Sequence, residues 1–434
     1  MFCVMMIALL LSNLFQPVAI EAASINTEAE SAVVVDADTG KVLFAKNPDI
    51  ALPPASMTKM MTEYLVWEAI ESGEIDWDTE TEISDYPYNL SANPEFSGVG
   101  LIQNKKYTVR QLYEAMAINS DNGTTIALAE LIAGTEGKFV EKMNAKAEEL
   151  GLQEARFVNS TGLDNAHLGE NYPEGTEADG VNLLSARSAA LLGYYLVKDY
   201  PESLEISNIP DMMFDDQEII NWNWMLDHKG ENLKPFYYEG VDGLKTGYTD
   251  LAGYCFTATG EKDGKRLIVV VMKTDSYEER FQETEKLFDY GFENFDRATL
   301  FSAGDQKEDE SSLEVAKGKE KEVEIALSDG FELVIKNDEE DLYEIEYEID
   351  ESLLNEDGEL TAPIEKGQKV GQAKLVYSGE ENYGNILAEE EDTVDLITTD
   401  AVEKDNWFMI ALSSVGEFFS NLFSTVSDKI KSWF

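Results

Sequence analysis

The chain has 434 residues, 43% of them hydrophobic, which is enough for two or three domains with buried cores and argues against global disorder. Its 33 Lys and Arg residues against 86 Asp and Glu residues give a formal net charge of −53. This charge argues against nucleic acid as a partner, because phosphates would be repelled.

The first 23 residues resemble a secretory signal peptide. An apolar run over residues 4–11 is followed by a polar break at Ser12 and Asn13 and by small residues at 22–24. The run departs from the usual pattern in one respect, since no Lys or Arg precedes Lys41. The sequence therefore predicts export of the chain, with residues 1–23 removed.

A hydroxyl and an amine then stand three residues apart at the start of a predicted helix. Residues 31–36 and 41–45 read as a strand hairpin, after which Pro53 and Pro54 restrict the backbone until an apolar helical pattern begins at or just before Ser56. Ser56 and Lys59 lie on neighbouring positions of one helical face, so they can form a hydrogen bond. The alternative is a serine cap followed by a surface lysine, because this spacing is common by chance.

A second polar cluster, Ser120-Asp121-Asn122, connects two predicted helices. After a polar loop over residues 71–104, a capping box at 108–111 opens a helix ending near residue 119, and a second helix covers 124–132. Polar side chains in such a connection can project into a cleft, although turn residues alone would give the same pattern. Further helices are predicted over 138–150 and 185–197.

The third cluster is Lys245-Thr246-Gly247, which the pattern places on or beside an edge strand. Residues 252–259 and 266–273 form a predicted hairpin behind it, and a helix over 276–290 is expected to end at Gly291. There the lysine and the hydroxyl reach into a cleft, while Gly247 would let a ligand approach the backbone.

The last third of the chain changes character twice. Residues 301–400 hold 31 acidic residues against eight Lys or Arg, and residues 343–350 alternate apolar and acidic side chains, so a small, sandwich-like β domain is expected over 299–400. In residues 401–434 large apolar side chains recur at spacings of three and four, which suits an amphipathic helix lying on a membrane surface. The alternative for this helix is docking on the protein's own core.

Taken in order, the three clusters resemble the signature set of the penicillin-binding proteins and serine β-lactamases. Within that superfamily the chain is similar to a low-molecular-mass D-alanyl-D-alanine carboxypeptidase. The supporting motifs are Pro54-Ala55-Ser56-Met57-Thr58-Lys59, Val241 to Gly247, Asn159 to Leu163, and Ala362 to Gly371. The resemblance implies an α/β (α+β) transpeptidase-like catalytic domain over 24–298, followed by the β-rich domain and the anchor helix.

The same resemblance implies roles for individual residues. Ser56 would be the nucleophile that attacks a D-Ala-D-Ala bond of a peptidoglycan stem peptide, and penicillin would inhibit it. Lys59 would be the general base, so its pKa would have to fall from about 10.4 to roughly 7. Further roles would fall to Ser120 as proton relay, Asn122 as orienting group, Lys245, Thr246 and Gly247 in substrate binding, and the backbone N–H of Tyr248, with that of Ser56, in the oxyanion hole.

No cofactor and no metal is expected, and the partners would be stem peptides, β-lactams and the membrane surface contacted by 401–434. The protein would lie on the outer face of a bacterial cytoplasmic membrane, peripherally anchored. A His-based triad is disfavoured, since His167 and His228 stand in polar surroundings and are expected at the surface.

Two alternatives stay open. A serine β-lactamase of the class with Asp at the middle position of the second cluster would add a Glu-x-x-Leu-Asn loop, and no such pentapeptide occurs between the second and third clusters. A non-catalytic cell-wall scaffolding protein with a dead peptidase fold is the other. Release of D-alanine from a pentapeptide would separate an enzyme from a scaffold.

Overall fold

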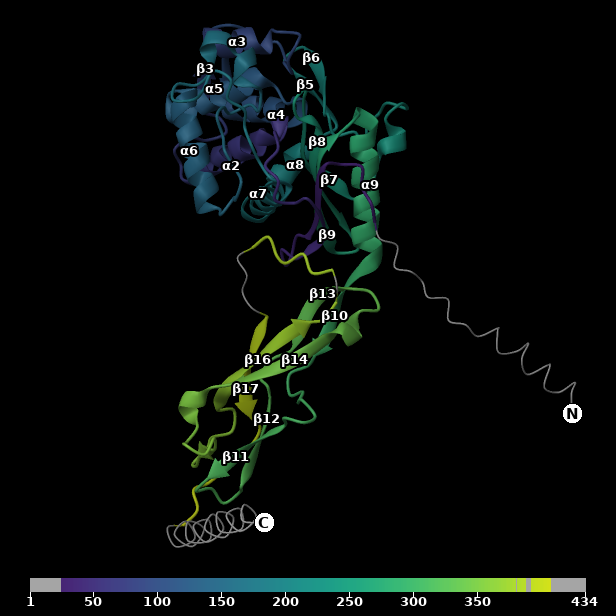
Figure 1. Cartoon of the computed structure of the whole chain (residues 1–434). Helices are drawn as coiled ribbons and strands as arrows, with labels where there is room; N and C mark the ends of the chain where they lie inside the picture. The colour runs from purple at the N-terminus through teal and green to yellow at the C-terminus, as the bar shows by residue number, and fades with distance from the viewer. Residues whose placement is uncertain (1–24, 380, 388–391, 407–434) are drawn as a thin grey trace, which may run out of the picture.

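The computed structural model describes residues 25–379, 381–387 and 392–406, which form an N-terminal α/β unit and a C-terminal β-rich unit (Figure 1). This confirms the expected class of both parts. The predicted signal peptide over residues 1–23 lies outside the described residues. So does nearly all of the predicted amphipathic helix, since residues 407–434 are not described.

The first unit is built on a five-stranded antiparallel sheet with the order β2-β1-β9-β8-β7. Its strands are β1 (Ser31–Asp36), β2 (Val42–Lys46), β7 (Val241–Thr249), β8 (Gly253–Lys262) and β9 (Lys265–Thr274). Both predicted hairpins are confirmed, and β7 is an edge strand as expected. Residues 267–272 of β9 are fully buried because helices cover both faces of the sheet.

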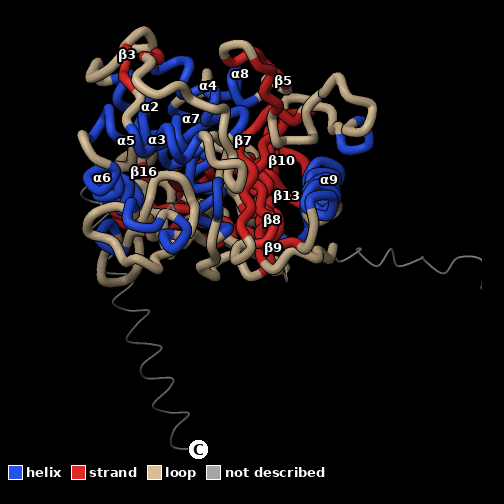
Figure 2. Tube along the Cα trace, turned by 90° about the horizontal axis from the view of Figure 1, so that it is seen from above, coloured by secondary structure: helices blue, strands red, loops and turns tan. Residues whose placement is uncertain are grey.

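Helix α9 (Tyr277–Asn294) covers one face of the sheet, and the remaining helices lie on the other (Figure 2). These are α2 (Lys59–Glu71), α3 (Asp85–Ser91), α4 (Val109–Asn119), α5 (Asn122–Ala133), α6 (Glu136–Glu149), α7 (Ala186–Asp199) and α8 (Ser203–Ser207). The short strand pairs β3 (Glu80–Glu82) with β4 (Lys106–Thr108), and β5 (Asp211–Phe214) with β6 (Gln217–Ile220), stand apart from the sheet.

Two expectations about these elements were wrong. Helix α9 does not end at Gly291, because this glycine serves packing: a Cβ there would lie 2.6 Å from Leu267 Cδ1 and 3.1 Å from Val34 Cγ1. The expected polar loop over residues 71–104 contains β3 and α3. Helix α3 packs against α5 and supports the start of that helix.

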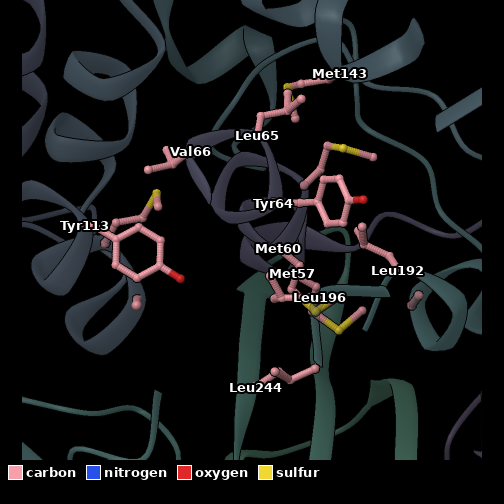
Figure 3. Close-up of a cluster of buried hydrophobic side chains, with 14 of the residues drawn as sticks. Met57, Met60, Tyr64, Leu65, Val66, Tyr113, Met143, Leu192, Leu196 and Leu244 are labelled. Atoms are coloured by element: carbon pink, nitrogen blue, oxygen red, sulfur yellow. The ribbon is translucent and has the colours of Figure 1, made fainter. Parts of the chain in front are cut away.

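Helix α2 runs through the centre of the main hydrophobic core, and Figure 3 shows side chains from several elements around it. Met57, Met60, Tyr64 and Leu65 pack there with Leu244 of β7 and with residues of α4, α6 and α7. A helix buried almost all round places its polar residues in the core as well. Lys59, Thr62 and Glu63 are therefore all buried.

The second unit contains a six-stranded sheet with the order β14-β16-β17-β12-β11-β15 and the two-stranded pair β10-β13. The strands are β10 (Phe295–Phe301), β11 (Ser312–Ala316), β12 (Glu322–Leu327), β13 (Phe331–Lys336), β14 (Tyr343–Ile349), β15 (Leu360–Thr361), β16 (Lys369–Tyr377) and β17 (Thr393–Thr398). The predicted alternation along β14 is confirmed, since Ile345 is buried while Glu344, Glu346 and Glu348 are exposed.

The two units touch through the connection between β16 and β17. Gly384 O accepts a hydrogen bond from Val42 N at 3.0 Å, and Ile386 N donates to Gly40 O at 2.9 Å. The Ile386 side chain is buried in the core of the first unit. The edge of the first sheet is thus covered by a segment from the second unit.

Candidate active site

Ser56 lies in a tight turn that precedes helix α2. Residues Ala55–Thr58 form one 3₁₀ turn, and Ala55 takes a positive φ of 47°, an uncommon conformation for a residue with a side chain. The turn is closed by the Met57 N–H, which donates to Pro54 O at 3.1 Å. The helical start expected at or just before Ser56 is confirmed.

The Lys59 side chain is fully buried and contacts three acceptors. Its Nζ lies 3.0 Å from Ser56 Oγ, 2.8 Å from Asn122 Oδ1 and 2.8 Å from Thr161 O. Burial, reinforced by the nearby positive charge of Lys245, lowers the pKa of Lys59 well below its ordinary value. A neutral amine donates two hydrogen bonds and accepts one, so it can serve Asn122 and Thr161 as donor while it accepts from the Ser56 hydroxyl.

Ser120 and Asn122 stand where α4 ends and α5 begins. Ser120 takes a left-handed conformation with φ of 64°, and its buried Oγ has no hydrogen-bond partner among the described residues. Asn122 Nδ2 donates to Ser97 O at 3.1 Å, which fixes the amide so that Oδ1 faces Lys59. The Asn122 amide is thus held in place from both ends, whereas the Ser120 hydroxyl has no partner that fixes it in the described part of the chain.

Asp121, between them, has a structural role. Its Oδ1 caps α5 by accepting from Thr124 N, and its Oδ2 accepts from Ser91 Oγ and from Val99 N, each at 2.7 Å. It therefore holds the segment around residues 91–99 against the start of α5. Asp121, which caps α5, and Ser120, whose left-handed backbone ends α4, both fit the turn interpretation of this cluster.

The third cluster lies on edge strand β7, beside the turn that carries Ser56. Lys245 is buried, and burial lowers its pKa to about 8. A Cβ on Gly247 would lie 2.5 Å from Pro54 O and 3.1 Å from Ser56 N. The glycine is thus required by the close approach of the Ser56 turn to the strand, a cause that the sequence did not reveal.

Residues of all three clusters meet at a hollow of about 360 Å³, here called the central hollow, although Lys59 and Lys245 are not among its lining residues. Its lining includes Ser56, Ser120, Asn122, Thr246, Gly247 and Tyr248, so residues from all three clusters are brought together. Lys59 contacts the hollow through its hydrogen bonds to Ser56 and Asn122.

Arg280 of α9 also lines the central hollow, and sequence reasoning missed it. Its Nη1 donates to Gly247 O at 3.2 Å and to Cys255 O at 3.3 Å, whereas its Nε and Nη2 are buried without a partner in the described part of the chain. Burial lowers its pKa to about 10, so it stays charged at neutral pH. The sequence contained one indication of its burial, since Arg280 lies on the same face of the helix as the buried residues Thr284, Leu287 and Gly291.

Two buried carboxyl groups near Lys59 were missed as well. Glu63, one turn after Lys59, accepts a hydrogen bond from Tyr113 Oη at 3.2 Å, and burial raises its pKa to about 7. Glu136 Oε1 accepts from Ser160 N at 2.9 Å and Ser160 Oγ at 2.7 Å, and burial likewise raises its pKa to about 7. Ser160 directly precedes Thr161, whose carbonyl receives Lys59, so Glu136 supports the wall of the site.

Neither histidine lines the central hollow. His167 is exposed as expected, but the expectation of a surface position for His228 was wrong, since its ring is buried and its Nε2 lies 2.8 Å from Asn223 O. A backbone partner satisfies the ring, so polar neighbours did not imply exposure. Within the described ranges, no group of three or more His, Cys, Asp or Glu is arranged to hold a metal ion, and no helix has the length and apolar character to span a membrane.

Comparison with known proteins identifies similar sequences and folds across most of the chain. A family model described as D-alanyl-D-alanine carboxypeptidase matches residues 18–276, and one described as penicillin-binding protein 5, C-terminal domain, matches residues 295–404. The carboxypeptidase DacF of Bacillus subtilis is 32% identical over 84% of this chain and 86% of its own length. DacA of Escherichia coli is 30% identical over 81% of this chain and 80% of its own.

Two solved structures are similar over nearly the same extent. The peptidoglycan synthesis regulatory factor PBP3 of Streptococcus pneumoniae has a TM-score of 0.66 and 35% identity, covering 87% of this chain and 100% of its own. Penicillin-binding protein 5 of Haemophilus influenzae has a TM-score of 0.64 and 28% identity, and the match covers 88% of this chain and 100% of that protein's chain. Both units of the fold are therefore shared with these proteins.

Proposed function

This chain belongs to the D-alanyl-D-alanine carboxypeptidase family, and from that membership we propose how its own residues carry out the reaction. The protein is a serine-type carboxypeptidase that removes the terminal D-alanine from peptidoglycan pentapeptides through an acyl-enzyme, and it binds penicillin. The assignment of each role below is our proposal.

Ser56 is the nucleophile and Lys59 its general base. The Ser56 hydroxyl gives its proton to the neutral Lys59 amine as Oγ bonds to the carbonyl carbon of the D-Ala-D-Ala amide. Two observations support this: the 3.0 Å contact between the two side chains and the lowered pKa of Lys59. The backbone N–H groups of Ser56 and Tyr248 stabilise the oxyanion, since both residues line the central hollow where the strand meets the turn.

Ser120 passes the proton from Lys59 to the leaving amine when the amide bond breaks. Its Oγ is buried at the hollow and unpaired among the described residues, so it is free to accept from Lys59 and donate to substrate. Asn122 keeps Lys59 in position through the 2.8 Å contact and presents its amide to the peptide. Water then attacks the acyl-enzyme ester, and Lys59 takes the proton of that water. The bond between the acyl carbon and Ser56 Oγ breaks, and Lys59 returns the proton to Ser56 Oγ.

Lys245, Thr246 and Arg280 bind the terminal carboxylate of the substrate, while Gly247 lets β7 lie against the Ser56 turn. Thr246 and Arg280 both line the central hollow, and the Nε and Nη2 donors of Arg280 have no partner among the described residues. The positive charges of Lys245 and Arg280 complement an anion. A buried guanidinium with two unsatisfied donors is costly without a ligand, which favours an anion at this position.

The domain limits that we propose are a signal peptide over 1–23, a catalytic domain over 24–298, a β-rich, sandwich-like domain over 299–400 and an amphipathic anchor helix over 401–434. Export fits the substrate, because peptidoglycan lies outside the cytoplasmic membrane. Peripheral binding to the outer face of that membrane rests on the apolar spacing in residues 408–433.

The observation that carries the proposed mechanism is the position of Lys59 Nζ between Ser56 Oγ and Asn122 Oδ1. The test is D-alanine release from a muropeptide, with benzylpenicillin hydrolysis measured in parallel. Release of D-alanine together with a long-lived penicilloyl adduct is expected. Rapid penicillin turnover without D-alanine release would indicate a β-lactamase, and neither activity in a folded protein would indicate a scaffold.

A further inference from the structure

A second hollow of about 420 Å³ opens beside the central hollow, and the Trp222 side chain lines both. The second hollow is lined by strand β6 and by Gly98, Asn119, Asn221, Trp222, Trp224, Asn232 and Leu233. A second link joins the two, because Tyr277 of the central hollow stacks on Trp224 of the second at 5.6 Å between ring centroids. The two hollows therefore have Trp222 as a common wall residue and adjoin at the stacked rings of Tyr277 and Trp224.

The residues that join the hollows also contact the leaving-group machinery. Trp222 Nε1 donates to Asn119 O at 3.0 Å, and Asn119 directly precedes Ser120. The Arg280 guanidinium lies 5.3 Å from the centre of the Tyr277 ring. Since Ser120 protonates the leaving amine and Arg280 binds the carboxylate of the same residue, the second hollow opens on the leaving-group side.

A leaving D-alanine has no use for a hollow of this size, because its side chain is one methyl group. The walls include Ile220 and Trp222, which are 52% and 39% exposed, and the amides of Asn119 and Gln217. Among the described residues that line it, Glu218 carries the one charged side chain. Exposed apolar walls of this kind favour an aliphatic chain, and the carboxylate disfavours an anionic one.

We propose that the second hollow is a leaving-group subsite for a D-amino acid with a long aliphatic side chain, an inference that rests on the proposed function. The reaction is unchanged: Ser56 forms the ester with the penultimate D-alanine, the amide bond breaks, the leaving amine takes the proton from Ser120, and water hydrolyses the ester. The leaving residue can come from two sources, a free-ended stem peptide with such a residue at position five, or the D-centre of a diamino acid in a cross-linked stem.

The test uses the full chain and peptides of the form diacetyl-L-Lys-D-Ala-D-Xaa, in which Xaa is alanine, norleucine or glutamate. We expect kcat/KM for the norleucine peptide to lie within about threefold of kcat/KM for the alanine peptide. For the glutamate peptide, kcat/KM should be about tenfold or more lower than for the norleucine peptide. Trp222→Ala should lower the norleucine-to-alanine ratio by about tenfold, whereas Trp222→Phe, which keeps a ring, should lower it by less than about threefold. Met213→Ala is the matched control, since Met213 is an exposed apolar residue of the β5–β6 hairpin that precedes Trp222 and lies outside both hollows.

The outcomes separate the inference from the function on which it rests. Two outcomes overturn the subsite alone. One is release of norleucine by the wild type at about a hundredth of the alanine rate or less, and the other is an equal fall in kcat/KM for the norleucine and alanine peptides in Trp222→Ala. Failure of the wild type to release D-alanine overturns the proposed function and the subsite together. Cleavage of a purified cross-linked dimer would assign the subsite to cross-links, and norleucine release without dimer cleavage would assign it to free-ended peptides.

Discussion

The amine of Lys59 lies 2.8 Å from Asn122 Oδ1, a contact that joins helix α2 to the first residue of α5 across 63 positions of the chain. The same amine reaches Ser56 in the turn that precedes α2 and Thr161 on a loop. Because these acceptors come from three segments, the amine cannot move away from Ser56 without losing contacts to the other two. This geometry leads to four predictions about single residues.

Ser56→Ala should abolish covalent labelling by a fluorescent penicillin and lower D-alanine release by about 10⁴-fold or more, because the attacking oxygen is removed. Labelling is read on a denaturing gel and release by a coupled D-amino acid oxidase assay. Ser72→Ala, at an exposed position after α2, is the control and should behave as wild type. Stoichiometric labelling of the Ser56→Ala protein would contradict the assignment of the nucleophile.

Glu63→Gln should shift the whole pH profile of penicillin acylation to lower pH. Above its own pKa of about 7, Glu63 is negatively charged and raises the pKa of both Lys59 and Lys245, so its removal lowers both. The rising limb follows loss of the proton from Lys59 and the falling limb follows loss of the proton from Lys245, whose pKa is about 8. A shift of about 0.5 to 1 pH unit is expected in the second-order rate constant.

The control for this profile is Glu74→Gln, which removes an exposed carboxylate beyond the end of α2. Its profile should match that of the wild type. An unchanged profile in Glu63→Gln, or a shift to higher pH, would show that Glu63 does not act on the two lysines.

Arg280→Met should raise KM for a D-Ala-D-Ala peptide by about 10- to 100-fold, because two charge-assisted donors to the terminal carboxylate are lost. The same variant should have a much smaller effect on a peptide whose terminal carboxylate is an amide. Arg187→Met, which breaks an ion pair of 2.6 Å with Asp49 outside the central hollow, is the control. An equal rise in KM for the peptide with a free carboxylate and for the peptide with a terminal amide would assign Arg280 a purely structural role.

The free energy of unfolding of Glu136→Gln should exceed that of the wild type by more at pH 8 than at pH 5. Burial raises the pKa of Glu136 from 4.5 to about 7 in the folded state, so the folded protein binds the proton more tightly. The stability linked to this group is therefore present below pH 4.5 and is lost as pH rises through 7. Glutamine keeps an acceptor for both Ser160 contacts and has no proton to lose.

The expected gain of this variant over wild type between pH 5 and pH 8 is about 2 to 3 kcal/mol, measured by urea unfolding at each pH. Glu141→Gln, an exposed residue of the same helix, should show no such trend. If the difference between Glu136→Gln and wild type is the same at both pH values, Glu136 does not titrate in this range.

The fold and most residues of the candidate site could be predicted because their signals are local. Apolar runs in 32–35 and 267–272, capping residues such as Thr108 and turn residues fix hairpins and helix starts within a few positions. The spacing of Ser56 and Lys59 likewise defines one helical face. These features place the hydroxyls, amines and amide that the chemistry needs, and they are properties of short segments.

Burial and proximity between distant segments were decided by the tertiary structure. Whether Lys59 is neutral depends on α4, α5 and the loop at Thr161 closing around it, and Arg280 and Glu136 reach the site only because α9 and α6 pack where they do. Gly247 and Gly291 are required by neighbours that lie far away in sequence. The sequence by itself determined which chemical groups are present and on which elements they stand, whereas packing determined their charge states and partners, because desolvation and Coulomb interactions depend on what surrounds a group in space.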